Sequence, residues 1–201
     1  MNYWERHYAA GGRSGEGSIN EARIWKQNIL KEYNVFNESV IDIGCGDLEF
    51  WENWFPTNYT GVDISKSIIH RNKLMYPGRN FICSSSSNVL YIQANVVTCF
   101  DVLFHLMDED DYIKTIENIA KYSTKYIFIY TWYRNPFESI WNRFVWKKPF
   151  HFNMITDGKY QYYRPFGKPE YQKPIYDAGF SLCDYRQDER WKYGAMYVYE
   201  K

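Results

Sequence analysis

Short runs of mainly apolar residues recur along the chain, and they lack the strict polar alternation of strands that expose one face to water. Segments long enough for helices separate these runs. Apolar strands joined by helices form a parallel sheet covered on both faces, so this rhythm predicts an α/β fold. The strands are expected at residues 39–43, 58–64, 80–83, 94–100 and 125–132.

The last part of the chain follows a different pattern. After a predicted helix that ends at Gly179, residues 180–200 form two runs joined by a polar turn, which is typical of an antiparallel hairpin. A length of 201 residues fits one domain. We therefore expect a single domain over residues 1–201, a Rossmann-like three-layer sandwich whose mostly parallel, seven-stranded sheet ends in an antiparallel hairpin.

Two further helices are predicted from local signals. Ser18 and Glu21 have the spacing of a capping box, which predicts a helix from there to about Tyr33. Residues 47–55, DLEFWENWF, lie between the first two expected strands, and we expect them to form the helix of a βαβ unit.

Composition and charge narrow the range of functions. Lys plus Arg and Asp plus Glu both number 24, so no global positive field attracts a nucleic-acid backbone. No apolar run reaches the roughly 20 residues of a membrane span, and the N-terminus MNYWERHYAAGG lacks the apolar core of a signal peptide. A cytoplasmic protein without a membrane partner is therefore expected. The four cysteines form no C-x-x-C pair, so we expect neither a metal site nor a disulfide framework.

The sequence VIDIGCGDLEF, residues 40–50, leads from the first expected strand through two glycines into acidic residues. In an open parallel sheet, ligands bind outside the carboxyl ends of the strands, beside the first strand. Asp63 ends the second expected strand, where a carboxylate can accept both hydroxyls of a ribose. This feature fits NAD and S-adenosylmethionine equally.

The charge at the glycine turn separates these two cofactors. A dinucleotide places its pyrophosphate on the turn and needs backbone donors there without competing anions. Asp47 occupies this position, Asp42 lies two residues before the turn, and Glu49 replaces the third glycine of G-x-G-x-x-G. The acidic strand ends, which also include Asp63 and Asp101, therefore favour a cationic sulfonium nucleoside.

The segments VIDIGCG, GVDIS and VVTCFD resemble motifs of class I S-adenosylmethionine-dependent methyltransferases, and the resemblance covers roughly residues 39–132. It implies S-adenosylmethionine as the cofactor and S-adenosylhomocysteine as the product. The cofactor contacts expected in this chain are Arg13, Asp42, Gly44, Cys45, Gly46, Asp47, Asp63, Ile64, Ser84, Ser85 and Asp101.

The resemblance also implies roles within this set. The glycine turn passes the methionine part of the cofactor, Asp47 or Asp42 takes its amino group, and Asp63 holds the ribose. This chain departs from the family at two places. Ser84 or Ser85 stands at the adenine position, where the family often has Asp, and Leu48 stands where the family often has a third glycine.

Residues 1–18 resemble the N-terminal segments of some bacterial small-molecule methyltransferases of this class. We expect them to form a lid over the cofactor, with Arg13 near the methionine carboxylate and Tyr3 or Tyr8 against the nucleoside or the substrate. A polar tail without such a role is the alternative.

Methyl transfer from a sulfonium is an in-line displacement, and a hydroxyl acceptor gains from a nearby base. His105, just past the fourth expected strand, is best placed to be this base, or it anchors the following helix as a structural residue. His7, His151 and Tyr133 are further candidates, whereas His70 is expected to face solvent.

Residues 133–168 follow the fifth expected strand, where this class of fold commonly inserts substrate-recognition elements. Cations among aromatic residues in this insertion suit an anionic, sugar-like or aromatic small molecule. A solvated helix that starts near Asn135 is the alternative. The substrate contacts expected are Trp132, Arg134, His151, Tyr163 and Arg164.

Asn135-Pro136-Phe137 also resembles the Asn/Asp-Pro-Pro-aromatic loop of amine-directed DNA methyltransferases. It has only one proline, however, and follows the fifth strand instead of the fourth. We therefore expect a methyltransferase for a small-molecule acceptor, with oxygen as the first expected site and nitrogen as the second, and no nucleic-acid partner. A methyltransferase for a macromolecule and a non-catalytic nucleoside-binding module are the alternatives.

Overall fold

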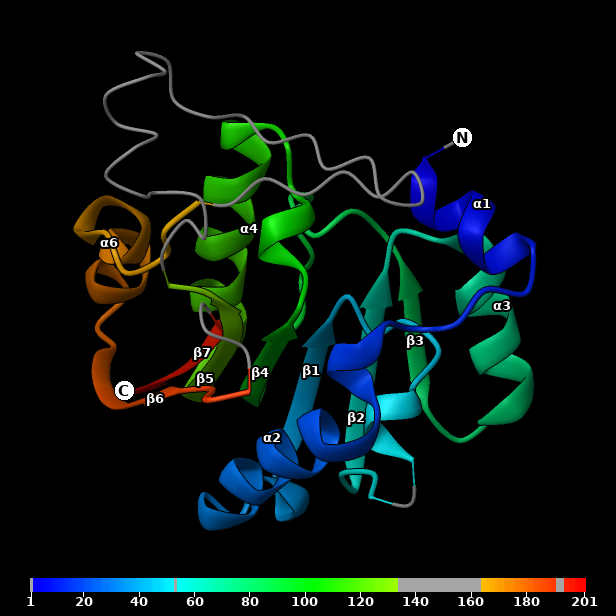
Figure 1. The fold of residues 1–201 in the computed structure, drawn as a ribbon, viewed down its shortest axis with the longest axis horizontal. Helices are drawn as coiled ribbons and strands as arrows, with labels where there is room; N and C mark the ends of the chain where they lie inside the picture. The colour runs from blue at the N-terminus through cyan, green and yellow to red at the C-terminus, as the bar shows by residue number, and fades with distance from the viewer. Residues whose placement is uncertain (1, 53, 134–163, 191–193) are drawn as a thin grey trace.

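The computed structural model describes residues 2–52, 54–133, 164–190 and 194–201. Its strands form one seven-stranded sheet in the order β3-β2-β1-β4-β5-β7-β6 (Figure 1). The strands are β1 (Ser39–Ile43), β2 (Asn58–Asp63), β3 (Asn80–Cys83), β4 (Ala94–Phe100), β5 (Ser123–Trp132), β6 (Ser181–Gln187) and β7 (Gly194–Glu200).

The first five strands are parallel, as predicted. Ile43 at the end of β1 lies opposite Val62 of β2 and Cys99 of β4. The carboxyl ends of these three neighbouring strands therefore meet at one edge of the sheet. The strand order reverses at β1, and this is the point at which ligands bind in open α/β sheets.

The sheet ends in the predicted antiparallel hairpin. Strand β7 runs antiparallel to both β5 and β6, and Trp132 at the end of β5 lies opposite Gly194 at the start of β7. The predicted fold class, a mostly parallel seven-stranded sandwich with a C-terminal antiparallel hairpin, is confirmed.

Helices cover both faces of the sheet (Figure 1). None of those in the described residues is long and apolar enough to cross a membrane. The α-helices are α1 (Tyr3–Ala9), α2 (Asn20–Glu32), α3 (Lys66–Met75), α4 (Glu109–Tyr122) and α6 (Pro169–Asp177). The short 3-10 turns are η1 (Glu16–Ser18), η2 (Val35–Asn37), η3 (Glu49–Trp51) and η4 (Leu103–His105).

Two hydrophobic clusters lie on opposite faces of the sheet because successive strand residues point to opposite sides. Ile41 of β1 belongs to a cluster that also contains Ile116 of α4. Its neighbour Val40 belongs to the other cluster, with Ile29 of α2 and Ile68 of α3. Both faces of β1 are therefore buried, which agrees with its nearly continuous apolar sequence.

The predicted capping box at Ser18 is wrong. Ser18 belongs to η1, in which its amide donates to the carbonyl oxygen of Gly15 (2.9 Å). Helix α2 begins only at Asn20, and its N-cap residue, Ile19, contributes no side-chain hydrogen bond. An N-cap residue has an extended backbone, which Ser18 cannot adopt while it belongs to η1. Ile19 has this extended backbone instead. The predicted end of this helix near Tyr33 is confirmed.

The predicted helix over residues 47–55 is also wrong, since the described part of this range forms only η3. Leu48 has a φ of 66°, in the left-handed region, so an α-helix cannot run through it. The Leu48 side chain is only 2% exposed. Its burial is worth about 1.5–3 kcal/mol, which offsets the roughly 1–2 kcal/mol cost of the left-handed backbone.

Candidate functional site

The turn after β1 has a backbone that glycine adopts far more readily than other residues. Gly44 has a φ of 75° and Gly46 a φ of 52°. The amides of Gly44 and Cys45 both donate to the carbonyl oxygen of Val62 in β2 (2.7 and 3.1 Å). A Cβ added at Gly44 would lie 2.2 Å from Cγ2 of Val102, which follows β4. The turn is therefore held between the ends of β2 and β4.

Asp63 ends β2 beside this turn and is largely buried. Its Oδ2 accepts the amide of Gly46 (3.0 Å), and its Oδ1 accepts the amide of Ser65 (2.9 Å). Burial raises the pKa of Asp63 to about 6, although the two amide donors act in the opposite direction. Each carboxylate oxygen has a second lone pair, so Asp63 can accept two hydroxyls in addition to the amides.

Asp47 joins the turn to the beginning of the chain. Its Oδ2 accepts the amide of Ser14 (2.8 Å), and its Oδ1 accepts the amide of Glu49 (3.2 Å). The Glu49 carboxylate forms an ion pair with Arg13, whose side chain is mostly exposed. Two predicted cofactor residues, Arg13 and Asp47, therefore come together at the turn.

Asp42 has a different environment from the other acidic candidates. It is buried within β1, and burial raises its pKa. Its Oδ2 accepts the indole N–H of Trp51 and the hydroxyl of Tyr59 (both 2.8 Å), and its Oδ1 accepts the hydroxyl of Thr98 (2.7 Å). The carboxylate of Asp42 is thus surrounded by donors from its own chain.

The residues after β2 and β3 continue the same edge. Ile64, directly after Asp63, is 41% exposed, so its apolar side chain can cover a flat ring. The amide of Ser84 donates to the carbonyl oxygen of Asp63 (2.9 Å). The hydroxyl of Ser85 is hydrogen-bonded to that of Ser87 (3.0 Å). This edge therefore offers a carboxylate, an apolar surface and hydroxyls side by side.

Residues 2–18, the N-terminal segment, bring α1 beside α3 (Figure 1). The Glu5 carboxylate accepts the hydroxyls of Ser65 (2.7 Å) and Ser67 (2.6 Å) at the start of α3. These hydrogen bonds lower the pKa of Glu5 to about 2. The segment is therefore anchored next to Asp63.

The same segment also lies against the glycine turn. The hydroxyl of Tyr8 is 3.3 Å from that of Ser14, and Tyr8 is buried. A Cβ added at Gly46 would lie 2.6 Å from the Ser14 hydroxyl and 2.8 Å from the Tyr8 hydroxyl. The second glycine of the turn therefore allows the segment to approach its backbone.

Two of the candidate catalytic residues, His105 and His7, flank one aromatic ring. The rings of Trp4 and His105 meet edge to face at 4.9 Å, and the rings of Trp4 and His7 at 5.8 Å. Tyr133 instead lies near Tyr185 of β6, with ring centroids 6.4 Å apart. The structure thus brings the two histidines together, although nearly a hundred positions separate them in the sequence.

Two of the predicted substrate contacts lie in the described residues. The Trp132 ring lies 5.8 Å from that of Phe104. Arg164 donates to the carbonyl oxygens of Leu106 and Met107, so it supports the loop that follows His105. The remaining predicted contacts, Arg134, His151 and Tyr163, lie outside the described residues, as do Asn135-Pro136-Phe137 and most of the expected insertion.

Other predictions concern residues away from this edge. His70 is exposed on α3, as predicted, and the four cysteines form no disulfide. Within the described ranges, the His, Cys, Asp and Glu side chains form no cluster that could hold a metal ion.

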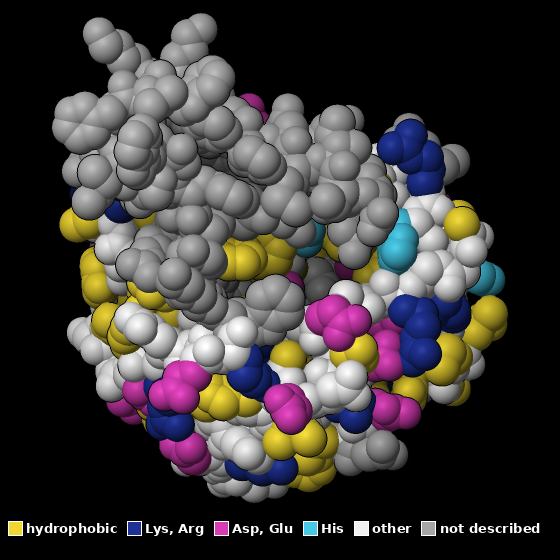
Figure 2. Space-filling view, viewed as in Figure 1, with side chains coloured by type: hydrophobic (Ala, Val, Ile, Leu, Met, Phe, Trp, Pro, Cys, Tyr) yellow, Lys and Arg dark blue, Asp and Glu magenta, His cyan; other side chains and the backbone are white. Residues whose placement is uncertain are grey.

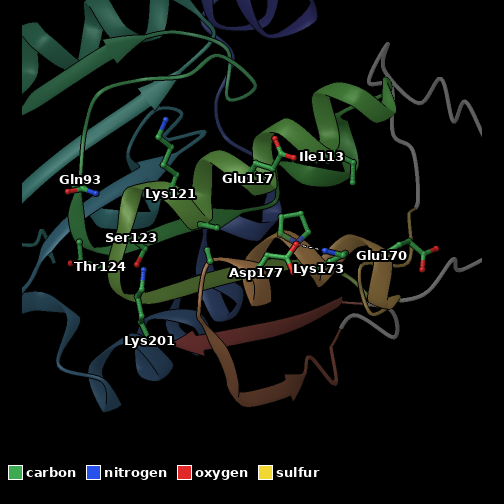
Figure 3. Close-up of a pocket in the computed structure, with 13 residues that line it drawn as sticks. Gln93, Ile113, Glu117, Lys121, Ser123, Thr124, Glu170, Lys173, Asp177 and Lys201 are labelled. Carbon is green, nitrogen blue, oxygen red and sulfur yellow. Dashed lines mark hydrogen bonds and ion pairs between the residues drawn. The ribbon is translucent and has the colours of Figure 1, made fainter.

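A broad groove of about 930 Å³ lies between α4 and α6 (Figure 3). Ser123 and Thr124, at the amino end of β5, form part of its lining. The Ser123 hydroxyl already donates to the carbonyl oxygen of Tyr126 (2.7 Å). Because β5 runs parallel to β4, the groove lies at the end of the sheet opposite to the glycine turn. It is therefore separate from the candidate site.

Sequence reasoning missed Lys26, a buried residue beside the candidate site. This lysine is fully buried and forms an ion pair with Asp101, directly after β4. A signal was present in the sequence: Lys26 is four positions after Ala22 and three before Ile29, on the apolar face of the predicted helix. A charged residue on that face requires a partner inside the protein.

Residues 41–128 match a family model described as a methyltransferase domain. No curated protein matches the chain in sequence. Among solved structures, magnesium protoporphyrin IX methyltransferase from Synechocystis PCC 6803, with bound S-adenosylhomocysteine, is similar with a TM-score of 0.65 and 15% identity. The match covers 98% of this chain and 92% of that chain.

Two further similar structures are named for different functions. The methyltransferase domain of bacterial CtHen1 matches with a TM-score of 0.61 and 18% identity, over 89% of this chain and 98% of that chain. The cyclase SpnF matches with a TM-score of 0.65 and 10% identity, over 98% of this chain and 90% of that chain. Identities this low show a shared fold alone, and one fold supports several activities.

The geometry of the turn leads to a stability prediction for Gly44→Ala. The left-handed backbone and the collision with Val102 are together expected to lower the free energy of unfolding by roughly 3 kcal/mol. Urea denaturation measures this change. Gly78→Ala is the matched control, because a Cβ there meets nothing within 4 Å. Equal stability of the two variants would contradict the described turn.

Proposed function

We propose that this class I S-adenosylmethionine-dependent methyltransferase transfers the methyl group to an oxygen atom of a small molecule. S-adenosylmethionine is the cofactor and S-adenosylhomocysteine the product. When bound, the cofactor supplies a methyl group on a positively charged sulfur. The contact between Trp4 and His105 (4.9 Å) carries the proposal for the acceptor, because through it the N-terminal segment reaches across the edge of the sheet. An edge enclosed in this way suits a small acceptor better than a polymer.

The residues at this edge fit a positively charged nucleoside cofactor. We assign the ribose hydroxyls to Asp63, whose oxygens have lone pairs beyond those used by the amides of Gly46 and Ser65. We assign the amino group to Asp47 and not to Asp42, since three side-chain donors already surround Asp42.

The adenine is assigned to the residues that follow β2 and β3. The exposed side chain of Ile64 provides an apolar surface for the flat ring. The hydroxyls of Ser84 and Ser85 can accept from its amino group, in place of the carboxylate that the family often has there.

The N-terminal segment is assigned as a lid over the cofactor. Its contacts reach three parts of the edge: Glu5 bonds to the start of α3, Ser14 to Asp47, and Trp4 packs on His105. This set of contacts supports a lid over the alternative of a polar tail without a role.

We assign His105 as the base that takes the proton of the acceptor hydroxyl while its oxygen bonds to the methyl group. His105 follows β4 at the edge where the cofactor residues gather. His7 flanks the same Trp4 ring and is the second candidate.

The distribution of charge supports a small acceptor over a nucleic acid. Among the described residues on the face seen in Figure 2, Lys and Arg side chains are interspersed with Asp and Glu instead of gathering by sign. The whole chain has equal numbers of both charges. A nucleic-acid backbone is bound through phosphate contacts that need a concentration of positive charge.

The acceptor class is tested with S-adenosylmethionine that is labelled in its methyl group. The protein is expected to label a component of a metabolite extract and to leave RNA, DNA and protein pools unlabelled. Carbon NMR of the labelled product then distinguishes a methyl on oxygen from one on nitrogen. Label in the polymer pools alone would refute the proposal. Calorimetric binding of S-adenosylhomocysteine without label in any pool would favour a non-catalytic binding module.

Cofactor affinity is expected to depend on the ionisation of Asp63. With the cofactor bound, two amides and two ribose hydroxyls would all donate hydrogen bonds to the Asp63 carboxylate. A protonated carboxyl group could not accept all four, because its own proton would point at one of the donors. At a pH below its pKa of about 6, Asp63 must therefore lose a proton when the cofactor binds. Affinity therefore rises with pH, and the Kd for S-adenosylhomocysteine is expected to be about tenfold weaker at about pH 5 than at about pH 7. Calorimetry measures this.

The Asp63→Asn variant is the control for the pH dependence. Its affinity is expected to be weaker throughout and to change little over the same pH range, because Asn does not titrate. A flat profile for the unmodified protein would exclude the assigned role of Asp63.

The role of His105 is tested by His105→Gln. The rate of label transfer to the acceptor is expected to fall roughly 100-fold or more, with an unchanged Kd for S-adenosylhomocysteine. His70→Gln, on the exposed surface of α3, is the control and is expected to react at the normal rate. Normal turnover of the His105→Gln variant would leave His105 as a structural residue and move attention to His7.

A further inference from the structure

Lys26 is a fully buried lysine to which the proposed reaction assigns no role. Its Nζ has three close partners. It donates to the carbonyl oxygen of Gly17 (3.0 Å), forms the ion pair with Asp101, and lies 3.8 Å from the ring centroid of Tyr130. Burial lowers the pKa of Lys26, and the Asp101 carboxylate opposes that shift. These partners come from the N-terminal segment, from the residue after β4, and from β5.

Asp101 has an unusual backbone at a sensitive point of the fold. Its φ is 59°, and its amide donates to the carbonyl oxygen of Tyr130 (3.1 Å). The next residue, Val102, packs against Gly44 of the glycine turn. A left-handed conformation costs roughly 1–2 kcal/mol in a residue with a Cβ. The contact with Lys26 helps to hold Asp101 in this conformation.

Gly17 places the N-terminal segment directly against the same carboxylate. A Cβ added at Gly17 would lie only 2.3 Å from Oδ2 of Asp101, so a larger residue could not approach in this way. Oδ2 is also the atom that Lys26 contacts. The Lys26 ammonium therefore contacts both the N-terminal segment, at Gly17, and the residue after β4, Asp101.

Tyr130 links Lys26 to a second ion pair, Asp188 with Arg190. The hydroxyl of Tyr130 donates to Oδ2 of Asp188 (2.8 Å), and Arg190 pairs with the same oxygen (2.7 Å). Asp188 is buried. The two acids and two bases of this cluster balance in charge. Each pair has one buried partner, Lys26 or Asp188, and one partly exposed partner, Asp101 or Arg190. Ion pairs with a buried partner add little to stability compared with well-packed apolar residues, but they specify geometry in some proteins.

We propose that Lys26 is a positioning residue that holds the Gly17 carbonyl and the Asp101 carboxylate together, so that docking of the N-terminal segment and orientation of Asp101 occur as one event. This inference rests on the proposed function, because it takes the ends of β1, β2 and β4 as the cofactor site. Lys26 acts through its neighbours and does not touch the reacting atoms.

The test combines two substitutions in the full chain. Lys26→Met removes the ammonium and keeps a side chain of similar length. Gly17→Ala pushes the segment away from Asp101 and leaves Lys26 in place. Each variant is expected to weaken the Kd for S-adenosylhomocysteine about tenfold, because each breaks the same contact. The double variant is expected to be no weaker than the weaker single variant, since coupled residues are not additive.

Matched controls make the same chemical changes away from this contact. Lys31→Met alters an exposed lysine of the same helix, and Gly78→Ala, outside the N-terminal segment, adds a Cβ that meets nothing within 4 Å. Both controls are expected to bind S-adenosylhomocysteine normally. Hydrogen exchange of the Ser14 amide, which donates to Asp47, is expected to accelerate in the Lys26→Met variant and not in the controls.

The outcomes separate this inference from the proposed function. If the unmodified protein does not bind S-adenosylhomocysteine, the proposed function fails. If it binds and Lys26→Met binds equally well, Lys26 has only a structural role and the inference is overturned. Effects that multiply to about a hundredfold in the double variant would show that Lys26 and Gly17 act independently, which also overturns it.

Discussion

The buried carboxylate of Asp42 connects the elements that form the edge of the sheet to which we assign the cofactor. It lies on β1 and accepts hydrogen bonds from Tyr59 of β2, Thr98 of β4 and Trp51 of η3. Taking such a group out of water costs several kcal/mol unless hydrogen bonds replace the water. The three donors must therefore stay in place, and they fix β1, β2 and β4 relative to one another. The glycine turn, Asp63 and Asp101 all depend on that arrangement.

The candidate site consists of two parts of the chain, the strand ends and the N-terminal segment. The strand ends provide carboxylates, and the segment meets them through a backbone amide and, by way of Lys26 on α2, through a backbone carbonyl. The amide of Ser14 reaches Asp47, and the carbonyl oxygen of Gly17 shares Lys26 with Asp101. In this protein the acidic edge is thus covered by the chain itself. The segment itself contains two acids, Glu5 and Glu16. Glu5 accepts hydrogen bonds from the hydroxyls at the start of α3.

The strands could be predicted because a strand that is buried on both faces consists almost entirely of apolar residues, and this pattern is visible in the strand's own sequence. Strands β1 and β4 are examples. Local signals failed where a distant contact decided the backbone. Leu48 adopts a left-handed conformation that its buried side chain favours, which ends the predicted helix over residues 47–55. Ser18 looked like a helix cap, but a short turn already uses its amide.

The sequence by itself determined the order of strands and helices, the glycine turn and the negative charge of the strand ends, because these follow from local pattern and position. It could not distinguish Asp42 from Asp47, since both are acids beside the same turn. Only the tertiary structure decided that Asp42 is enclosed by three donors and that Asp47 faces the N-terminal segment. The same holds for Lys26: its partners, Gly17 and Asp101, are 9 and 75 positions away, so their meeting depends on how the helix packs on the sheet.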